Sequence, residues 1–275
     1  MKNRFKGAPW ISIAIISIFI FLGIFGEFIA PHDATGMALV DKFKPPVFLK
    51  GGSFEYILGT DELGRDVLSR IIVGGRISFI VALSAIVVGC VFGTLLGVLA
   101  GYYGKLVDTV IMRLTDATLA FPAILLALLL SLTIGPGIKS AIISIAFSMW
   151  AKYTRTIKTD VRILKLKNYV VQSKIMGASN LRIMAKHIIP NIRNTIIAMV
   201  TMDIGMAIIS EASLSFLGLS VIPPTPSWGL MIADGKDYFV KAPWVSVFPA
   251  IVTIITVISF QRVGDWIKNK GDKRP

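Results

Sequence analysis

The sequence predicts an all-α integral membrane protein with six transmembrane helices, and three observations lead to this fold class. Apolar residues make up 54% of the 275 residues and charged residues only 16%, whereas a soluble domain is roughly 45–50% apolar and about 25% charged. Several uncharged stretches reach the ~20 residues that a helix needs to cross a bilayer. Lys and Arg outnumber Asp and Glu by 29 to 16, and the excess lies in alternate loops, as the positive-inside rule expects.

The chain divides into four regions. Residues 1–30 hold a basic N-terminal tail and the first span, and residues 31–76 form a polar loop on the opposite side of the membrane. Residues 77–265 form the core, and residues 266–275 form a C-terminal tail. The core spans are predicted at residues 77–104, 112–138, 139–155, 191–217 and 242–262, with a long loop at residues 156–190.

The span at residues 139–155 has the weakest apolar signal, because only 12 uncharged residues separate Lys139 from Lys152. A helix that crosses there must carry both lysines, whose aliphatic stems can extend to the interfaces. With this span included, 20 of the 29 Lys and Arg residues lie on the side of the N-terminus. The positive-inside rule then places both termini in the cytoplasm.

Glycines spaced four residues apart occupy one face of the second predicted span. Between helices in lipid, association depends on close backbone approach, which small residues permit. We therefore expect tight packing along this face, either within the chain or against a partner chain. The glycines are Gly89, Gly93, Gly97 and Gly101.

The loop at residues 156–190 is too long for a simple connection, since loops above about 12–15 residues usually carry function. Gly177 separates two helical stretches, and Ser179 or Asn180 can cap the second one. Pro190 suits the first turn of the following span. The basic residues of this loop are compatible with a segment that lies on anionic lipid. The helix–glycine–helix pattern also predicts a docking surface for a soluble partner.

The same loop carries a recognisable signature. Residues 169–191 (YVVQSKIMGASNLRIMAKHIIPN) resemble the EAA coupling loop of ABC importer permeases, above all in the glycine and the proline. Three other stretches are similar to the dipeptide/oligopeptide/nickel branch of that family, and within it to the second, C-type permease subunit. They are residues 58–70 (LGTDELGRDVLSR), 211–219 (EASLSFLGL) and 223–229 (PPTPSWG), and the match covers about residues 54–265.

The resemblance implies a type I ABC importer permease fold with a cytoplasmic coupling-helix loop, in the inner or plasma membrane of a prokaryotic cell. A second homologous permease, two ABC ATPase subunits and an extracytoplasmic solute-binding protein would complete the importer. ATP and Mg²⁺ would be used by the ATPase subunits, and no cofactor by this non-catalytic chain. Neither Gly–Lys pair, at 104–105 or 235–236, fits the phosphate-binding pattern G-x-x-x-x-G-K-[ST].

The resemblance also assigns contact with the ATPases to the middle of the coupling loop. The E-A-A positions of the family pattern are Val171, Gln172 and Ser173, so the acidic residue is missing and an ion pair through position 171 is not expected. The glycine and proline hinges are present. The expected coupling residues are Gln172, Ser173, Met176, Gly177, Ala178, Ser179, Leu181 and Arg182.

Ionisable residues within the predicted spans indicate a translocation path, because charges in lipid are costly and usually face a cavity or a partner. Asp203 and Ser210 are seven residues apart and nearly share a helix face, whereas Glu211 lies about 80° away. We expect Asp203 to face the path, where it can meet the amino group of a peptide, and Ser210 and Glu211 are further candidates. Pairing with a basic neighbour is the alternative. Asp116 can pair with Arg113, three residues before it.

The predicted function is therefore import of dipeptides or oligopeptides that a binding protein delivers. Nickel or a metal chelate is the alternative cargo. A secondary, ion-coupled transporter is the alternative of another class, but it would need internal repeats, and none is evident. One cysteine and two histidines exclude a disulfide framework and a Cys/His metal site. The expected partners are proteins and membrane lipid, with no nucleic acid.

Overall fold

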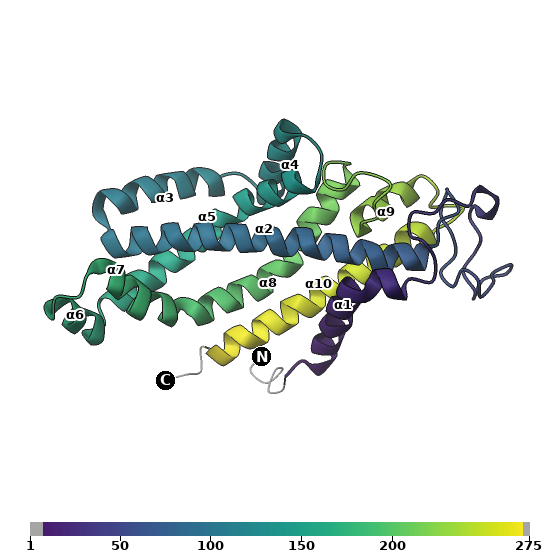
Figure 1. Cartoon of the computed structure of the whole chain (residues 1–275). Helices are drawn as coiled ribbons and strands as arrows, with labels where there is room; N and C mark the ends of the chain where they lie inside the picture. The colour runs from purple at the N-terminus through teal and green to yellow at the C-terminus, as the bar shows by residue number, and fades with distance from the viewer. Residues whose placement is uncertain (1–7, 272–275) are drawn as a thin grey trace.

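The computed structural model describes residues 8–271, which are helical wherever they are regular, with no strand in this range. The basic residues expected in the N-terminal tail and the last four residues of the C-terminal tail lie outside the described residues. The long helices extend between two ends of an elongated molecule (Figure 1). The loop end carries residues 30–66 and α9 (Trp228–Lys236), and the elbow end carries α6 (Asn168–Ile175) and α7 (Asn180–Ile183).

Most of the predicted spans correspond to helices that can cross a membrane. Four are long and apolar enough among the described residues, and α3 with α4 makes a fifth if the two are counted together. The sixth predicted span corresponds to α5, which is ~42 Å long at 1.5 Å per residue but contains several basic residues. The helices are α1 (Trp10–Ile29), α2 (Val67–Tyr103), α3 (Lys105–Leu119), α4 (Ala123–Ile134), α5 (Ile138–Lys165), α8 (Ile189–Phe216) and α10 (Trp244–Gly271).

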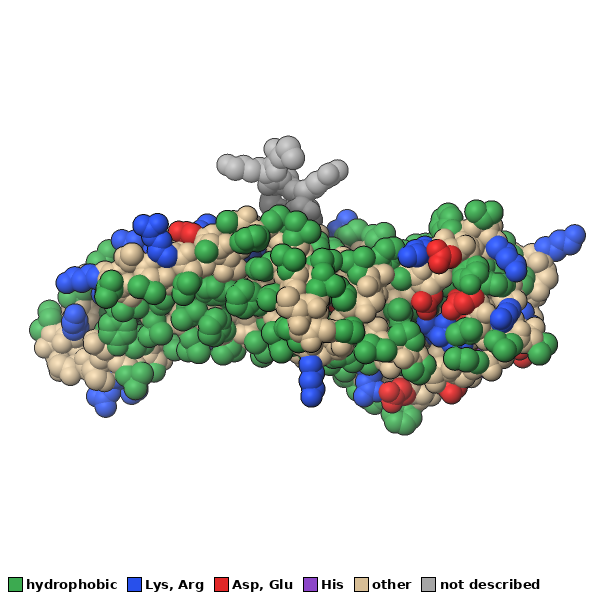
Figure 2. Space-filling model, turned by 90° about the horizontal axis from the view of Figure 1, so that it is seen from above, with side chains coloured by type: hydrophobic (Ala, Val, Ile, Leu, Met, Phe, Trp, Pro, Cys, Tyr) green, Lys and Arg blue, Asp and Glu red, His purple; other side chains and the backbone are tan. Residues whose placement is uncertain are grey.

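The surface has the charge distribution of a membrane protein. Seen from above, the middle of the molecule is largely hydrophobic, and most of the charged side chains gather toward its two ends (Figure 2). Apolar side chains such as Val88, Val91 and Leu95 of α2 are more than half exposed in the isolated chain. Such side chains suit contact with lipid, which solvates them as well as a protein core does.

The predicted span at residues 112–138 differs from the continuous helix expected there. α3 and α4 meet at an angle of 90°. Pro122 has no backbone N–H to donate, and it disfavours the helical conformation at Phe121 before it. Helix α3 therefore ends at Leu119 and α4 starts at Ala123.

Helices α2 and α5 extend well beyond their predicted spans, and α10 continues past its predicted end to Gly271. α2 starts at Val67 because the Asp66 carboxylate caps it, accepting a hydrogen bond from the Ser69 N–H at 2.9 Å. α5 continues to Lys165, so the first part of the predicted coupling loop is the end of a long membrane helix. The rest of that loop consists of α6, α7 and a π-helical turn over Met184–Ile188 that leads directly into α8.

The four-residue glycine repeat of α2 packs against α5. A Cβ atom built on Gly93 would lie 2.4 Å from the carbonyl oxygen of Trp150, and one built on Gly101 would lie 2.8 Å from that of Lys158. In the same way, a Cβ atom on Gly89 would meet the carbonyl oxygen of Ala146, and one on Gly97 would meet that of Thr154. The positions rise together along both helices, so α2 and α5 run side by side in the same direction. We call this contact the glycine seam.

A substitution at Gly93 tests the glycine seam. The new side chain would meet the backbone carbonyl oxygen of Trp150, which cannot move aside as a flexible side chain can. Gly93→Val should destabilise the folded chain by about 3 kcal/mol, at the upper end of typical overpacking costs. The measurement is thermal unfolding of the purified protein in detergent. Leu95→Phe enlarges a side chain of the same helix that is 55% exposed and should leave stability unchanged. Equal melting temperatures for the two variants would show that the seam is not tight.

Candidate functional site

The middle of α5 carries two basic side chains that pair with acids on the helices at either side. Lys152 Nζ lies 2.5 Å from Asp203 Oδ1 of α8. One turn further along, Arg155 forms an ion pair with Asp116 of α3. Asp116 therefore pairs across helices, and not with Arg113 of its own helix as the spacing suggested. We call these four residues the paired face of α5.

The two pairs differ in how deeply their acids are buried. Lys152 and Asp203 lie halfway along α5 and α8, and the Asp203 side chain is 2% exposed while that of Lys152 is 54% exposed. Arg155 and Asp116 are 53% and 61% exposed. Each basic group therefore has an open side as well as a carboxylate partner. The sequence predicts that Asp203 faces the translocation path, with pairing to a basic neighbour as the alternative, and the structure contains such a pair. The partner, Lys152, was not identified, although it ends the uncharged run of the fourth span.

Further pairs tie α5 to its neighbours closer to the elbow end. Lys158 Nζ lies 2.5 Å from Asp108 Oδ1 of α3, and these side chains are only 16% and 22% exposed. The hydroxyl of Thr195 on α8 donates to Asp160 Oδ2 at 2.7 Å. Because α3 and α8 are both anchored to α5, the surface of α5 between them has a fixed set of polar side chains.

The other two candidates for the translocation path lie apart from Asp203. The Ser210 hydroxyl donates to the carbonyl of Met206, one turn before it on α8. Glu211 is fully buried and accepts hydrogen bonds from the hydroxyls of Ser215 at 2.7 Å and Ser220 at 3.4 Å. Glu211 thus belongs to a buried hydroxyl cluster toward the loop end, and the structure does not bring it together with Asp203.

The expected coupling residues gather on α6, α7 and the turn between them. Met176 and Leu181 are 86% and 74% exposed, which makes an apolar surface at the elbow end. Gly177 has φ = +85° with open space around it, so the backbone conformation requires glycine here. Ser179 caps α7 by accepting from the Arg182 N–H at 3.3 Å. The remaining members are Gln172, Ser173 and Ala178, in α6 and the turn.

The inner side of this elbow is anchored to the membrane helices. Val170 of α6 and Ile183 of α7 are buried in one hydrophobic cluster with Ile157 of α5. The Tyr102 hydroxyl at the end of α2 donates to Asn180 Oδ1 at 2.9 Å. The inner side of the elbow is therefore packed against α2 and α5.

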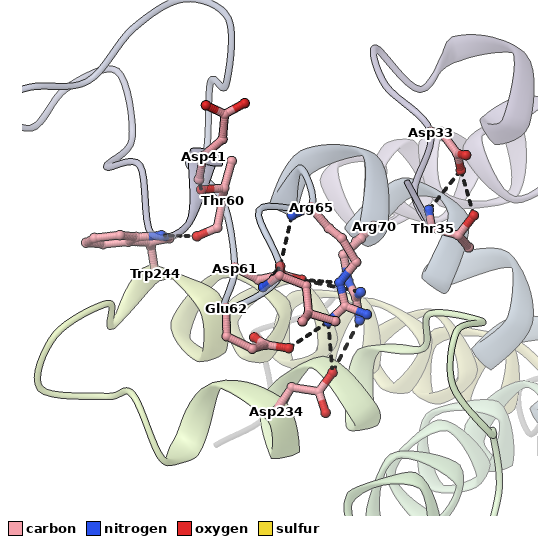
Figure 3. A network of polar contacts seen from close by, with 11 residues as sticks. Asp33, Thr35, Asp41, Thr60, Asp61, Glu62, Arg65, Arg70, Asp234 and Trp244 are labelled. Carbon is pink, nitrogen blue, oxygen red and sulfur yellow. Dashed lines mark hydrogen bonds and ion pairs between the residues drawn. The ribbon is translucent and has the colours of Figure 1, made fainter. Parts of the chain in front are cut away.

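A cluster of charged side chains lies at the loop end. The sequence motif at residues 58–70 contains four of its members, but not Asp234. Arg65 lies 2.7 Å from both Asp61 and Glu62, and Arg70 lies 3.3 Å from both Asp61 and Asp234 (Figure 3). The two arginine side chains are 4% and 1% exposed. The cluster joins residues 61–70 to α9, a segment more than 150 residues away in sequence. Only the folded chain brings Asp234 to the arginines.

We call Asp61, Glu62, Arg65, Arg70 and Asp234 the outer cluster. Burial has the largest effect on the pKa values of two of its acids. It raises the pKa of Asp234 above its ordinary value, against the opposing effect of Arg70 and Arg65. Burial also raises the pKa of Glu62, and the charge of Asp61 adds to this effect. Among the described residues, no group of three or more His, Cys, Asp or Glu side chains is arranged to hold a metal ion. The arrangement is therefore suited to holding segments together.

Arg70→Gln tests the importance of the outer cluster. Breaking a buried ion pair by removing one partner costs about 3–5 kcal/mol, since a buried charge is left uncompensated, so we expect a lower unfolding temperature in detergent. The matched control is Arg76→Gln on the same helix, whose pair with Glu27 is 35% and 58% exposed. Such exposed pairs contribute about 0–1 kcal/mol. Equal losses in the two variants would contradict a clamping role.

Comparison with known proteins gives consistent matches along the chain. The family model described as "Binding-protein-dependent transport system inner membrane component" matches residues 93–273. The di/tripeptide transport system permease protein DppC of Pseudomonas aeruginosa is 37% identical, with 94% of this chain and 85% of that protein aligned. The glutathione transport system permease protein GsiD of Escherichia coli is 39% identical, with 94% and 84% aligned.

The fold is also shared with a solved structure. A chain of the MetNI methionine ABC transporter, in an inward-facing conformation, matches 73% of this chain and 95% of its own length with a TM-score of 0.57 and 16% sequence identity. The helices described above therefore have the type I ABC importer permease fold. From the family match and the identity to these relatives, the chain belongs to the family of binding-protein-dependent transport system inner membrane components.

Proposed function

We propose that this permease forms the translocation path for short peptides, together with a second homologous permease. The observation that carries the proposal is the 36–39% identity, over at least 94% of the chain, to permeases named for dipeptides, di/tripeptides and glutathione. Glutathione is itself a tripeptide, so these three cargoes share one chemistry. An extracytoplasmic binding protein delivers the peptide at the loop end, which the outer cluster keeps rigid.

The energy for import comes from two ABC ATPase subunits, which bind ATP and Mg²⁺. Their docking surface is the exposed side of α6 and α7, with the coupling residues from Gln172 to Arg182. Two features support this assignment: the apolar exposure of Met176 and Leu181, and the packing that links the elbow to α2 and α5.

The elbow end and both termini lie in the cytoplasm. The proposal is supported by the charge distribution, with 20 of the 29 Lys and Arg residues in the segments assigned to that side. It is also supported by the glycine seam. Because α2 and α5 run in the same direction, the bent pair of α3 and α4 must return the chain across the membrane between them.

Reconstitution tests the proposed function. The chain is purified with its second permease and the two ATPases, placed in proteoliposomes and supplied with the binding protein and a radiolabelled dipeptide. We expect uptake that requires ATP and stops when the Walker lysine of the ATPases is replaced. Uptake driven by a proton gradient without the ATPases would instead indicate a secondary transporter.

A charge placed on the elbow tests the docking surface. Met176→Asp and Leu181→Asp each put a carboxylate on an apolar side chain that the ATPase would desolvate, so we expect the ATPases to dissociate during purification and uptake to fall at least tenfold. Leu106→Asp changes a side chain of similar exposure, 76%, at the start of α3. This control should keep both ATPases. If the elbow variants also retain ATPases and uptake, docking occurs elsewhere.

A further inference from the structure

The paired face of α5 is poorly suited to contact with lipid. A charged side chain at the bilayer centre costs about 2.5–3.5 kcal/mol even on the scale with the lowest values. Lys152 and Arg155 lie at or near the middle of a 28-residue helix, and their side chains are 54% and 53% exposed in the isolated chain. We therefore expect this surface to be in contact with water or with protein in the assembled importer.

A cavity adjoins the paired face at Lys152, the partner of Asp203. Its volume is about 440 Å³, and Lys152, Thr156 and Asp160 of α5 form one wall, while Thr195 and Met199 of α8 form another. A volume in the range of roughly 300–1,000 Å³ is typical of small-ligand sites. The cavity is thus large enough for a short peptide. Its polar side chains are the amino groups of Lys152 and Lys268, the carboxylate of Asp160, the amide of Asn194 and two threonine hydroxyls.

The charges of the paired face balance. Lys152 and Arg155 contribute two positive charges, and Asp203 and Asp116 contribute two negative ones. A peptide with free termini carries the same two kinds of charge at its two ends. An ion pair in the wall can therefore open and form two new pairs, one with the carboxylate of the peptide and one with its ammonium group, without change in net charge.

We propose that the paired face of α5 is the part of the path that recognises the charged termini of the peptide, with Lys152 and Arg155 for the carboxylate and Asp203 for the ammonium group. This inference rests on the proposed function and deepens it. Because an existing ion pair in the wall must open before the peptide can bind, binding stays weak enough for the peptide to leave, as conduction through a membrane protein requires. The closed pairs keep the wall neutral when no peptide is present.

Transport kinetics of a neutral double variant test the proposal. Lys152→Gln with Asp203→Asn removes both charges at once, so no uncompensated charge remains in the membrane. We expect normal assembly and binding-protein-stimulated ATP hydrolysis, but at least tenfold slower dipeptide uptake and correspondingly more ATP hydrolysed per peptide. Lys152→Arg keeps the charge and should restore uptake to within twofold of wild type.

The matched control is the pair closer to the elbow end. Lys158→Gln with Asp108→Asn removes an ion pair between the same two kinds of residue, with side chains only 16% and 22% exposed, and uptake should stay near wild type. Wild-type uptake by the Lys152/Asp203 variant would overturn the proposal. The proposal would also be overturned if the Lys152/Asp203 variant failed to assemble while the Lys158/Asp108 variant assembled, because the first pair would then be structural. If the wild-type importer moves no peptide, the proposed function fails instead.

Discussion

The close packing of α2 on α5 is the contact on which the rest of the structure depends. α5 has too many charges to sit alone in lipid, and hydrophobic association gives little help between helices in a bilayer. Because its glycines have no Cβ atom, the backbone of α2 approaches the α5 carbonyl oxygens more closely than any other residue would allow. One side of α5 is thereby buried, and its basic side chains are left between α3 and α8, where their acidic partners lie.

Charged side chains have two different roles, one at the loop end and one in the middle of α5. At the loop end, Arg65 and Arg70 are almost completely buried and share carboxylates from two distant segments, an arrangement that fixes the segments relative to each other. In the middle of α5, Lys152 and Arg155 are half exposed, and Lys152 lines a cavity. An ion pair in which both groups are enclosed holds structure together, whereas a pair in which one group has an open side can also open toward a ligand.

Much of this architecture could be predicted from the sequence, because spans, loop charges and the glycine repeat are local or periodic signals. The elbow was also predictable, since Gly177 and Ser179 act on their own segment. The bend before α4 has a local cause in Pro122, which has no N–H to donate to a continuous helix. The partners of Lys152 and Arg70 could not be predicted, because they depend on which helices become neighbours, and residues 152 and 203 or 70 and 234 meet only in the folded chain.

The most direct test of this account is the water accessibility of the α5 surface in the assembled importer. Thr156→Cys on the cavity wall and Val91→Cys on the outer side of α2 are made in a chain whose own cysteine is replaced by Cys90→Ala, and each is exposed to a small, charged thiol reagent in the absence of nucleotide. The account predicts that position 156 reacts readily and that position 91, in lipid, does not. An unreactive position 156 beside a reactive position 91 would contradict it.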